Sequence, residues 1–183
     1  MTTTIATQIP TGTWTVDPGH STVGFAVKHM GIATVRGKFE QFEGALEVTE
    51  NGVVARGTVQ AASVNTNEEQ RDAHLRSADF FNAEANPVIA FQSTAIEPVD
   101  EDTFEITGDL TINGVTNPIT LKAEIQGLDT DPWGNERVGL EVTGQLSRGD
   151  YGMTFNQALG SGNMLVADKV KLALDISAVR SAK

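Results

Sequence analysis

The sequence predicts an all-β protein, an antiparallel closed β-barrel of about eight strands with one short helical insertion near residues 66–81. The first observation behind this prediction is that apolar side chains fall on every second residue in many segments, as in Val23, Phe25 and Val27. Because successive strand side chains point to opposite faces, this period of two indicates antiparallel strands with one apolar face each. The second observation is that long helical patterns are almost absent. A barrel closed around an apolar inner face is a natural container for an apolar ligand.

The individual strands are assigned where turn residues interrupt the alternation. A long ribbon is expected from Thr34 to Thr49, and its apolar parity switches near Glu40–Gln41, which indicates a β-bulge there. Asn51-Gly52 and Asn113-Gly114 are hairpin signals, because both residue types accept the backbone of a tight turn. The expected strands cover 13–17, 20–29, 34–49, 53–64, 88–97, 104–112, 119–125, 138–142 and 166–179, with longer loops at 131–135 and 156–163.

Two segments depart from this rhythm. Residues 1–11 are rich in threonine and are predicted to form a flexible N-terminal arm, which leaves 12–183 as the barrel domain. Residues 66–81 carry good helix formers, and Thr66 with Glu69 has the spacing of a capping box. We expect this insertion to form a helix beside the barrel.

The composition excludes several classes of protein. A formal net charge of -11 argues against nucleic acid as a partner, because a phosphate backbone is bound through Lys and Arg. It also argues against docking on an anionic membrane through a basic patch. The chain has no cysteine, which excludes disulfides and thiol chemistry. No run approaches the roughly 18 apolar residues of a membrane helix, and the first residues lack the regions of a secretory signal, so a cytoplasmic protein is expected.

The chain also resembles a known family. One signature near the start comprises Trp14, Asp17-Pro18, His20-Ser21, Phe25, His29, Val35, Gly37-Lys38-Phe39, Phe42 and Gly44. A second in the middle comprises Ser63-Val64-Asn65-Thr66, Arg71-Asp72, His74-Leu75 and Asp79-Phe80-Phe81, and it is followed by GDLTINGVT at 108–116 and SRGDYGM at 147–153. In this order the motifs resemble the YceI-like family of lipocalin-like barrels, which are associated with binding polyisoprenoids and other long-chain lipids.

The resemblance implies a long-chain lipid partner, a polyisoprenoid or an isoprenoid quinone, that is sequestered or transported without chemistry. It also implies a homodimer as a candidate assembly, although no residue pattern here requires one. Length of the ligand chain matters, because a buried CH₂ contributes about 0.8 kcal/mol against an association cost of about 4–15 kcal/mol. The candidate ligand-binding residues in the lumen are Phe25, Val27, Phe39, Phe42, Phe80, Phe81, Phe91, Leu110 and Phe155, with His29, Arg71 and His74 for a polar end.

Catalytic and metal sites are not expected. Asp17, His20 and Ser21 are the residue types of a hydrolase triad, but neighbours in one turn do not have triad geometry. We expect Asp17 to bind backbone amides of the turn instead. His20 and His29 have opposite strand parity and His74 stands on another element, so the three histidines do not predict a zinc site, and no cofactor is expected.

Three alternatives remain open at the level of sequence. The ligand can be a fatty acid or a fatty amide. The same barrel can be an enzyme acting on a lipid-like substrate, which requires a titratable group facing the cavity, and His29 or Asp150 are the available groups. Finally, the phenylalanines can fill the lumen completely, since buried aromatic side chains dominate most cores, and the protein is then an interaction module.

Overall fold

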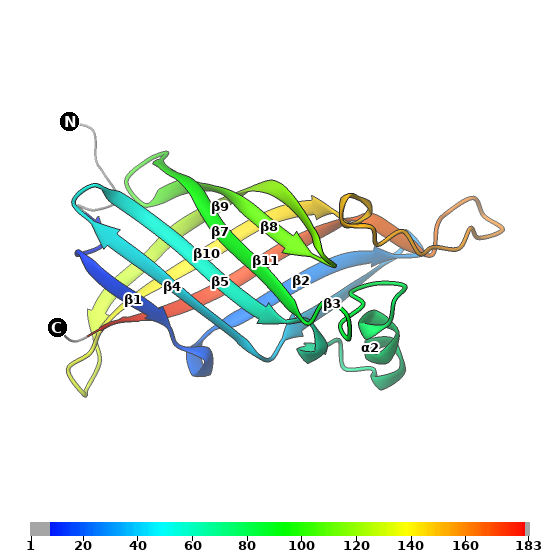
Figure 1. Ribbon diagram of the computed structural model, residues 1–183, viewed down its shortest axis with the longest axis horizontal. Helices are drawn as coiled ribbons and strands as arrows, with labels where there is room; N and C mark the ends of the chain where they lie inside the picture. The colour runs from blue at the N-terminus through cyan, green and yellow to red at the C-terminus, as the bar shows by residue number, and fades with distance from the viewer. Residues whose placement is uncertain (1–7, 182–183) are drawn as a thin grey trace.

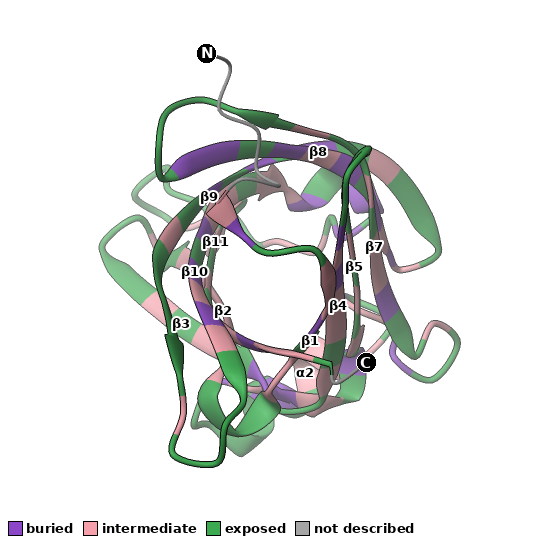
Figure 2. Ribbon diagram, turned by 90° about the vertical axis from the view of Figure 1, so that its left-hand side faces the viewer, coloured by how far each residue is buried: buried purple, intermediate pink, exposed green. Residues whose placement is uncertain are grey.

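Eleven β-strands pair into one closed antiparallel sheet in the computed structural model, which describes residues 8–181 (Figure 1). Their order is β1-β4-β5-β7-β8-β9-β10-β11-β2-β3-β6, and a further pairing of β1 with β11 closes the sheet. Figure 2 looks along the barrel from the end at which β1 begins and β11 ends. The strands are β1 (Gly12–Val16), β2 (Thr22–His29), β3 (Ala33–Phe39), β4 (Phe42–Thr49), β5 (Gly52–Gln60), β6 (Val64–Asn65), β7 (Val88–Pro98), β8 (Thr103–Ile112), β9 (Val115–Thr130), β10 (Glu136–Ser147) and β11 (Val166–Arg180).

Three strands of the barrel are broken at neighbouring positions, so the eleven segments form eight barrel strands. β1 and β2 both pair with β11 and are separated by the 3-10 turn η1 (Pro18–His20). β4 pairs with β1, and β3 pairs with β2. β5 and β6 are separated by the 3-10 turn η2 (Ala61–Ser63). The prediction of a closed antiparallel barrel of about eight strands is therefore confirmed.

The break between β3 and β4 corrects the prediction of one ribbon with a β-bulge. At the break the two backbone amides bind Ser63, Glu40 N donating to its carbonyl at 3.1 Å and Gln41 N to its hydroxyl at 3.1 Å. β3 then pairs with β2 and β6, whereas β4 pairs with β1 and β5. The parity switch in the sequence thus marks the position at which the chain exchanges one pair of partner strands for another.

The helix of the predicted insertion is shorter than residues 66–81. It is α2 (Glu69–Arg76), and the expected capping box of Thr66 with Glu69 does not form. The Glu68 carboxylate caps the helix instead, because it accepts hydrogen bonds from two backbone amides of the first turn. Within residues 8–181, no helix is both long enough and apolar enough to cross a bilayer.

The last residues of the predicted N-terminal arm pack against the barrel. Residues 1–7 lie outside the described residues, but Ile9 is fully buried in the hydrophobic core. Trp14 is also fully buried and donates its indole N–H to the carbonyl of Pro10 at 2.9 Å. The burial of its side chain anchors Ile9 to the barrel, whereas Pro10 and Thr11 are exposed.

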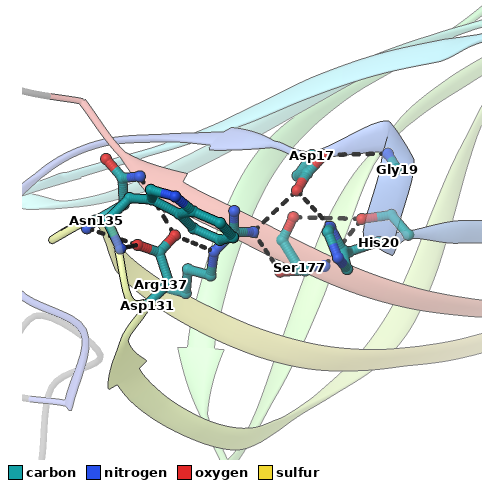
Figure 3. A network of polar contacts seen from close by, with 9 residues as sticks. Asp17, Gly19, His20, Asp131, Asn135, Arg137 and Ser177 are labelled. Carbon is teal, nitrogen blue, oxygen red and sulfur yellow. Dashed lines mark hydrogen bonds and ion pairs between the residues drawn. The ribbon is translucent and has the colours of Figure 1, made fainter.

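An ion-pair network around Arg137 ties the turn of η1 to β10 (Figure 3). Arg137 Nη1 donates to Asp17 Oδ2 at 2.9 Å, and Arg137 Nε donates to Asp131 Oδ2 at 2.8 Å. The other Asp17 oxygen accepts from Gly19 N at 3.0 Å, which confirms the expected role of Asp17 in the turn. The hydrogen bonds from Arg137 are the main reason why the pKa of Asp17 and that of Asp131 are each lowered to about 2.

Removing Arg137 is expected to change the acid stability of the barrel. In an Arg137→Gln protein the pKa of Asp17 and that of Asp131 should rise from about 2 toward 3.8. A carboxylate whose pKa is lowered by folding stabilises the folded state above its unfolded pKa, and this stabilisation is lost as pH falls through the folded pKa. The difference in unfolding free energy between wild type and variant should therefore be constant near neutral pH and shrink from pH 4 to pH 2.

Carboxyl NMR titration and urea unfolding across this range check the expectation. Arg56→Gln is the matched control, because it removes the exposed ion pair between Arg56 and Glu47 without touching the network. Unchanged pKa values of Asp17 and Asp131 in Arg137→Gln would contradict the assignment.

Candidate functional site

The barrel surrounds a cavity of about 300 Å³ that is almost entirely apolar. Its walls come from all eight barrel strands, from Leu75 of α2, and from Phe80 and Phe81, which follow the helix. The lining residues that carry a charge are Glu43, Arg56 and Arg148. Glu43 and Arg56 are exposed, at strand positions whose side chains alternate outward. Such a volume lies at the lower end of the range for small-molecule sites, which suits one slim apolar ligand.

Aromatic rings that lie across glycines keep this interior open. Gly37 is the cross-strand partner of Phe25, and a methyl carbon built on Gly37 would lie 2.4 Å from Cζ of Phe25. In the same way, a methyl carbon on Gly108 would lie 2.5 Å from Cζ of Phe91. Each ring therefore covers the bare backbone of a neighbouring strand instead of filling the lumen. Phe25 and Phe91 are only half-buried although they line the cavity, because their inner faces border empty space.

The cavity is tightly packed at one end. Trp14, Phe104 and Ala178 line it there and have exposed fractions of 0%, 1% and 2%. We call these three residues the floor of the cavity. They belong to the end of the barrel at which β1 begins and β11 ends, where Val48 and Val138 are buried as well. This end is therefore the most closely packed part of the cavity wall.

Eight of the twelve predicted site residues line the cavity. These are Phe25, Val27, Phe39, Phe42, Phe80, Phe81, Phe91 and Leu110. Phe39 connects two of the others, since its ring centroid lies 5.6 Å from that of Phe25 and 5.6 Å from that of Phe81. Six of these eight lie on strands, where alternation assigns a face to each side chain, and Phe80 and Phe81 belong to the predicted insertion.

The other four predicted residues, His29, Arg71, His74 and Phe155, do not line the cavity. Their partners explain why. Arg71 donates through Nε to the hydroxyl and through Nη2 to the carbonyl of Thr66, both at 2.7 Å. His74 Nε2 lies 2.8 Å from Asp79 Oδ2, and its ring packs edge to face against Phe155. His29 sits at the end of β2.

Arg148 is a cavity residue to which the sequence assigns no role. Its exposed fraction is 5%, and its guanidinium carbon lies 5.9 Å from the ring centroid of Phe80. Burial lowers the pKa of Arg148, while the nearby carboxylate of Asp168 opposes that effect. The sequence marks Arg148 only as part of the 147–153 motif, and its burial depends on distant segments that alternation does not locate.

The hydrolase arrangement considered for η1 is not formed. His20 Nδ1 lies 2.8 Å from Asp17 Oδ2, but Asp17 is also bound by Arg137. The Ser21 hydroxyl both accepts from the amide of Ser177 at 2.9 Å and donates to its carbonyl at 3.3 Å. The Ser21 side chain thus takes the place of a backbone hydrogen-bonding partner for Ser177 of β11. His20 is exposed at the surface.

Comparison with known proteins agrees with this architecture. The model of the YceI-like domain matches residues 14–178. Protein YceI of Escherichia coli is 42% identical over 135 residues, which cover 72% of this chain and 70% of the relative. BcnA of Burkholderia cenocepacia has a similar structure with a TM-score of 0.77 at 20% identity, covering 88% of this chain and 98% of BcnA. A polyisoprenoid binding domain from Saccharophagus degradans, implicated in plant cell wall breakdown, gives a TM-score of 0.71 at 15% identity, with coverage of 92% and 98%.

The contact between Phe25 and Gly37 can be tested by substitution. In Gly37→Ala, the new methyl carbon occupies the place of the Phe25 ring, which must move toward the lumen. Overpacking of this kind costs about 1–3 kcal/mol, and we expect uptake of an apolar fluorescent probe to fall as well. Urea unfolding and probe titration measure the two effects.

Two further variants isolate the cause. In Gly37→Ala combined with Phe25→Ala the loss from the glycine substitution should be smaller than in wild type, because the ring, which makes the closest contact, is gone and Thr66 Cγ2 at 2.8 Å still meets the new carbon. Gly127→Ala is the control, since a methyl carbon there meets no atom within 4 Å. Equal losses from Gly37→Ala with and without the Phe25 ring would show that this contact does not hold the cavity open.

Proposed function

Because the chain belongs to the YceI-like family, we propose that it binds one long-chain apolar lipid, a polyisoprenoid or an isoprenoid quinone, in the barrel cavity. The observation that carries this proposal is the apolar cavity lined by half-buried phenylalanines. An apolar chain replaces empty space beside these rings and loses contact with water, which is favourable. The polyisoprenoid binding domain of Saccharophagus degradans, which has the same fold, supports this class of ligand.

The ligand is sequestered or carried rather than transformed. His29 and Asp150, the two groups available to an enzyme at this site, do not line the cavity. Apart from Thr58, Glu43, Arg56 and Arg148, every residue that lines the cavity is apolar or a glycine. General acid–base chemistry requires a titratable group within hydrogen-bond reach of the reacting atom, and a long apolar chain along this wall meets very few.

The proposal also favours an open lumen over an interaction module. A module with a filled interior needs no empty volume, whereas about 300 Å³ is empty here. Burial of each further CH₂ contributes about 0.8 kcal/mol, so affinity should grow with chain length until the cavity is full.

Native mass spectrometry of protein purified from the organism that encodes it tests the proposal first. We expect one lipid per chain, and organic extraction then identifies it. A clean mass without ligand, together with no uptake of polyprenols, isoprenoid quinones or fatty amides, would overturn lipid binding.

A pair of valine substitutions tests the location of the ligand. Val27 lines the cavity, whereas Val99 is 64% exposed on the turn between β7 and β8. Val27→Asp should weaken polyprenol uptake at least tenfold, since an apolar chain would have to desolvate a carboxylate. Val99→Asp should leave uptake unchanged. Retained uptake in a folded Val27→Asp protein would place the ligand outside this cavity.

A further inference from the structure

Arg148 is a buried cation at the wall of the cavity that has no carboxylate in direct contact among residues 8–181. Its three hydrogen bonds all go to backbone carbonyls, from Nε to Ala167 at 2.8 Å, from Nη1 to Met153 at 2.6 Å and from Nη2 to Val166 at 3.2 Å. The nearby carboxylate of Asp168 is occupied by the Ser147 hydroxyl and by the amide of Gly149. A charge enclosed in this way is costly unless a polar group approaches it.

The guanidinium also has donors to spare. It carries five N–H groups, and three of them are used by the carbonyls, so two remain. One belongs to each terminal nitrogen. Two N–H groups on one planar fork match two oxygens of an anionic group, or one oxygen with two lone pairs. The carbonyl contacts hold the fork in place, which lowers the entropy lost when a ligand binds.

We propose that Arg148 is the head-group site of the cavity and binds a hydrogen-bond-accepting oxygen of the lipid, an anionic oxygen more tightly than a neutral one. This inference rests on the proposed lipid-binding function and adds the position and chemistry of the polar end. Arg71 and His74, the candidates from the sequence, are bound by Thr66 and Asp79 outside the cavity. The lipid tail then extends from Arg148 along the apolar wall.

The sign of a pKa change in the bound ligand tests the site in the wild-type protein. The probe is geranylgeranoic acid labelled with ¹³C at the carboxyl group, titrated by NMR in the complex. Beside Arg148 the acid should have a lower pKa than in water, because a cation favours the carboxylate. A carboxyl group buried elsewhere in the apolar cavity has a raised pKa, and one that protrudes into solvent keeps its ordinary value. Either of these results would overturn the proposal.

Substitution gives an independent measurement with chain-matched ligands. Geranylgeranoic acid, geranylgeraniol and the parent hydrocarbon are compared by displacement of an apolar dye. In wild type the acid should bind about 10- to 100-fold more tightly than the hydrocarbon, as expected for hydrogen bonds to a charged group. Arg148→Met should abolish this preference and leave hydrocarbon binding intact, whereas Arg148→Lys should restore part of it.

The matched control is Arg36→Met, which removes an exposed arginine of β3 and should keep the full preference. If no ligand displaces the dye from any variant, the proposed function itself fails. If all three ligands bind wild type equally well, lipid binding stands and Arg148 is not the head-group site. Should Arg148→Met fail to fold, the ligand titration in wild type decides alone.

Discussion

Closure of the sheet on itself is the constraint on which the other features depend. An open sheet leaves unpaired backbone groups at its edges, and it must bury one face against another layer. Here β11 pairs with β10 on one side and with both β1 and β2 on the other, so the ladder continues around the barrel. The wall therefore satisfies its own hydrogen bonds, and the interior can remain partly empty. At η1, where pairing along β11 passes from β1 to β2, Arg137 holds the turn in place through Asp17.

Close packing and empty volume are distributed unevenly along the barrel. The floor residues and their buried neighbours supply close packing at one end, where their side chains are removed from water. Toward α2 the walls carry rings that lie over bare backbone, and these rings remain half-buried. Close packing at one end compensates for contacts that the empty part does not make. A single core filled throughout would be more stable and would have no room for a ligand.

Much of the wall could be predicted from sequence, because the period of two reports directly which side chains face inward. It placed Phe25, Phe91 and Leu110 at the cavity. Features that depend on the meeting of distant segments were missed. The break at Glu40–Gln41 is held by hydrogen bonds to Ser63. The Thr66 hydroxyl does not cap a helix, because it donates to Asp72 and accepts from Arg71. Arg148 is buried only because residues 153, 166 and 167 return to it, and spacing along the chain does not show this.

The floor has a consequence for chain length. On the proposed function, the closely packed end at Trp14 would act as a ruler, because a lipid tail that reached the indole would have to leave any surplus length outside the barrel. Within the ruler each added isoprene unit increases the apolar area removed from water, whereas beyond it further units gain nothing. Substitutions that deepen or raise the floor thus reset the preferred length without altering the chemistry of the walls. On the proposed function, lipids that differ only in chain length are distinguished by the depth of the cavity.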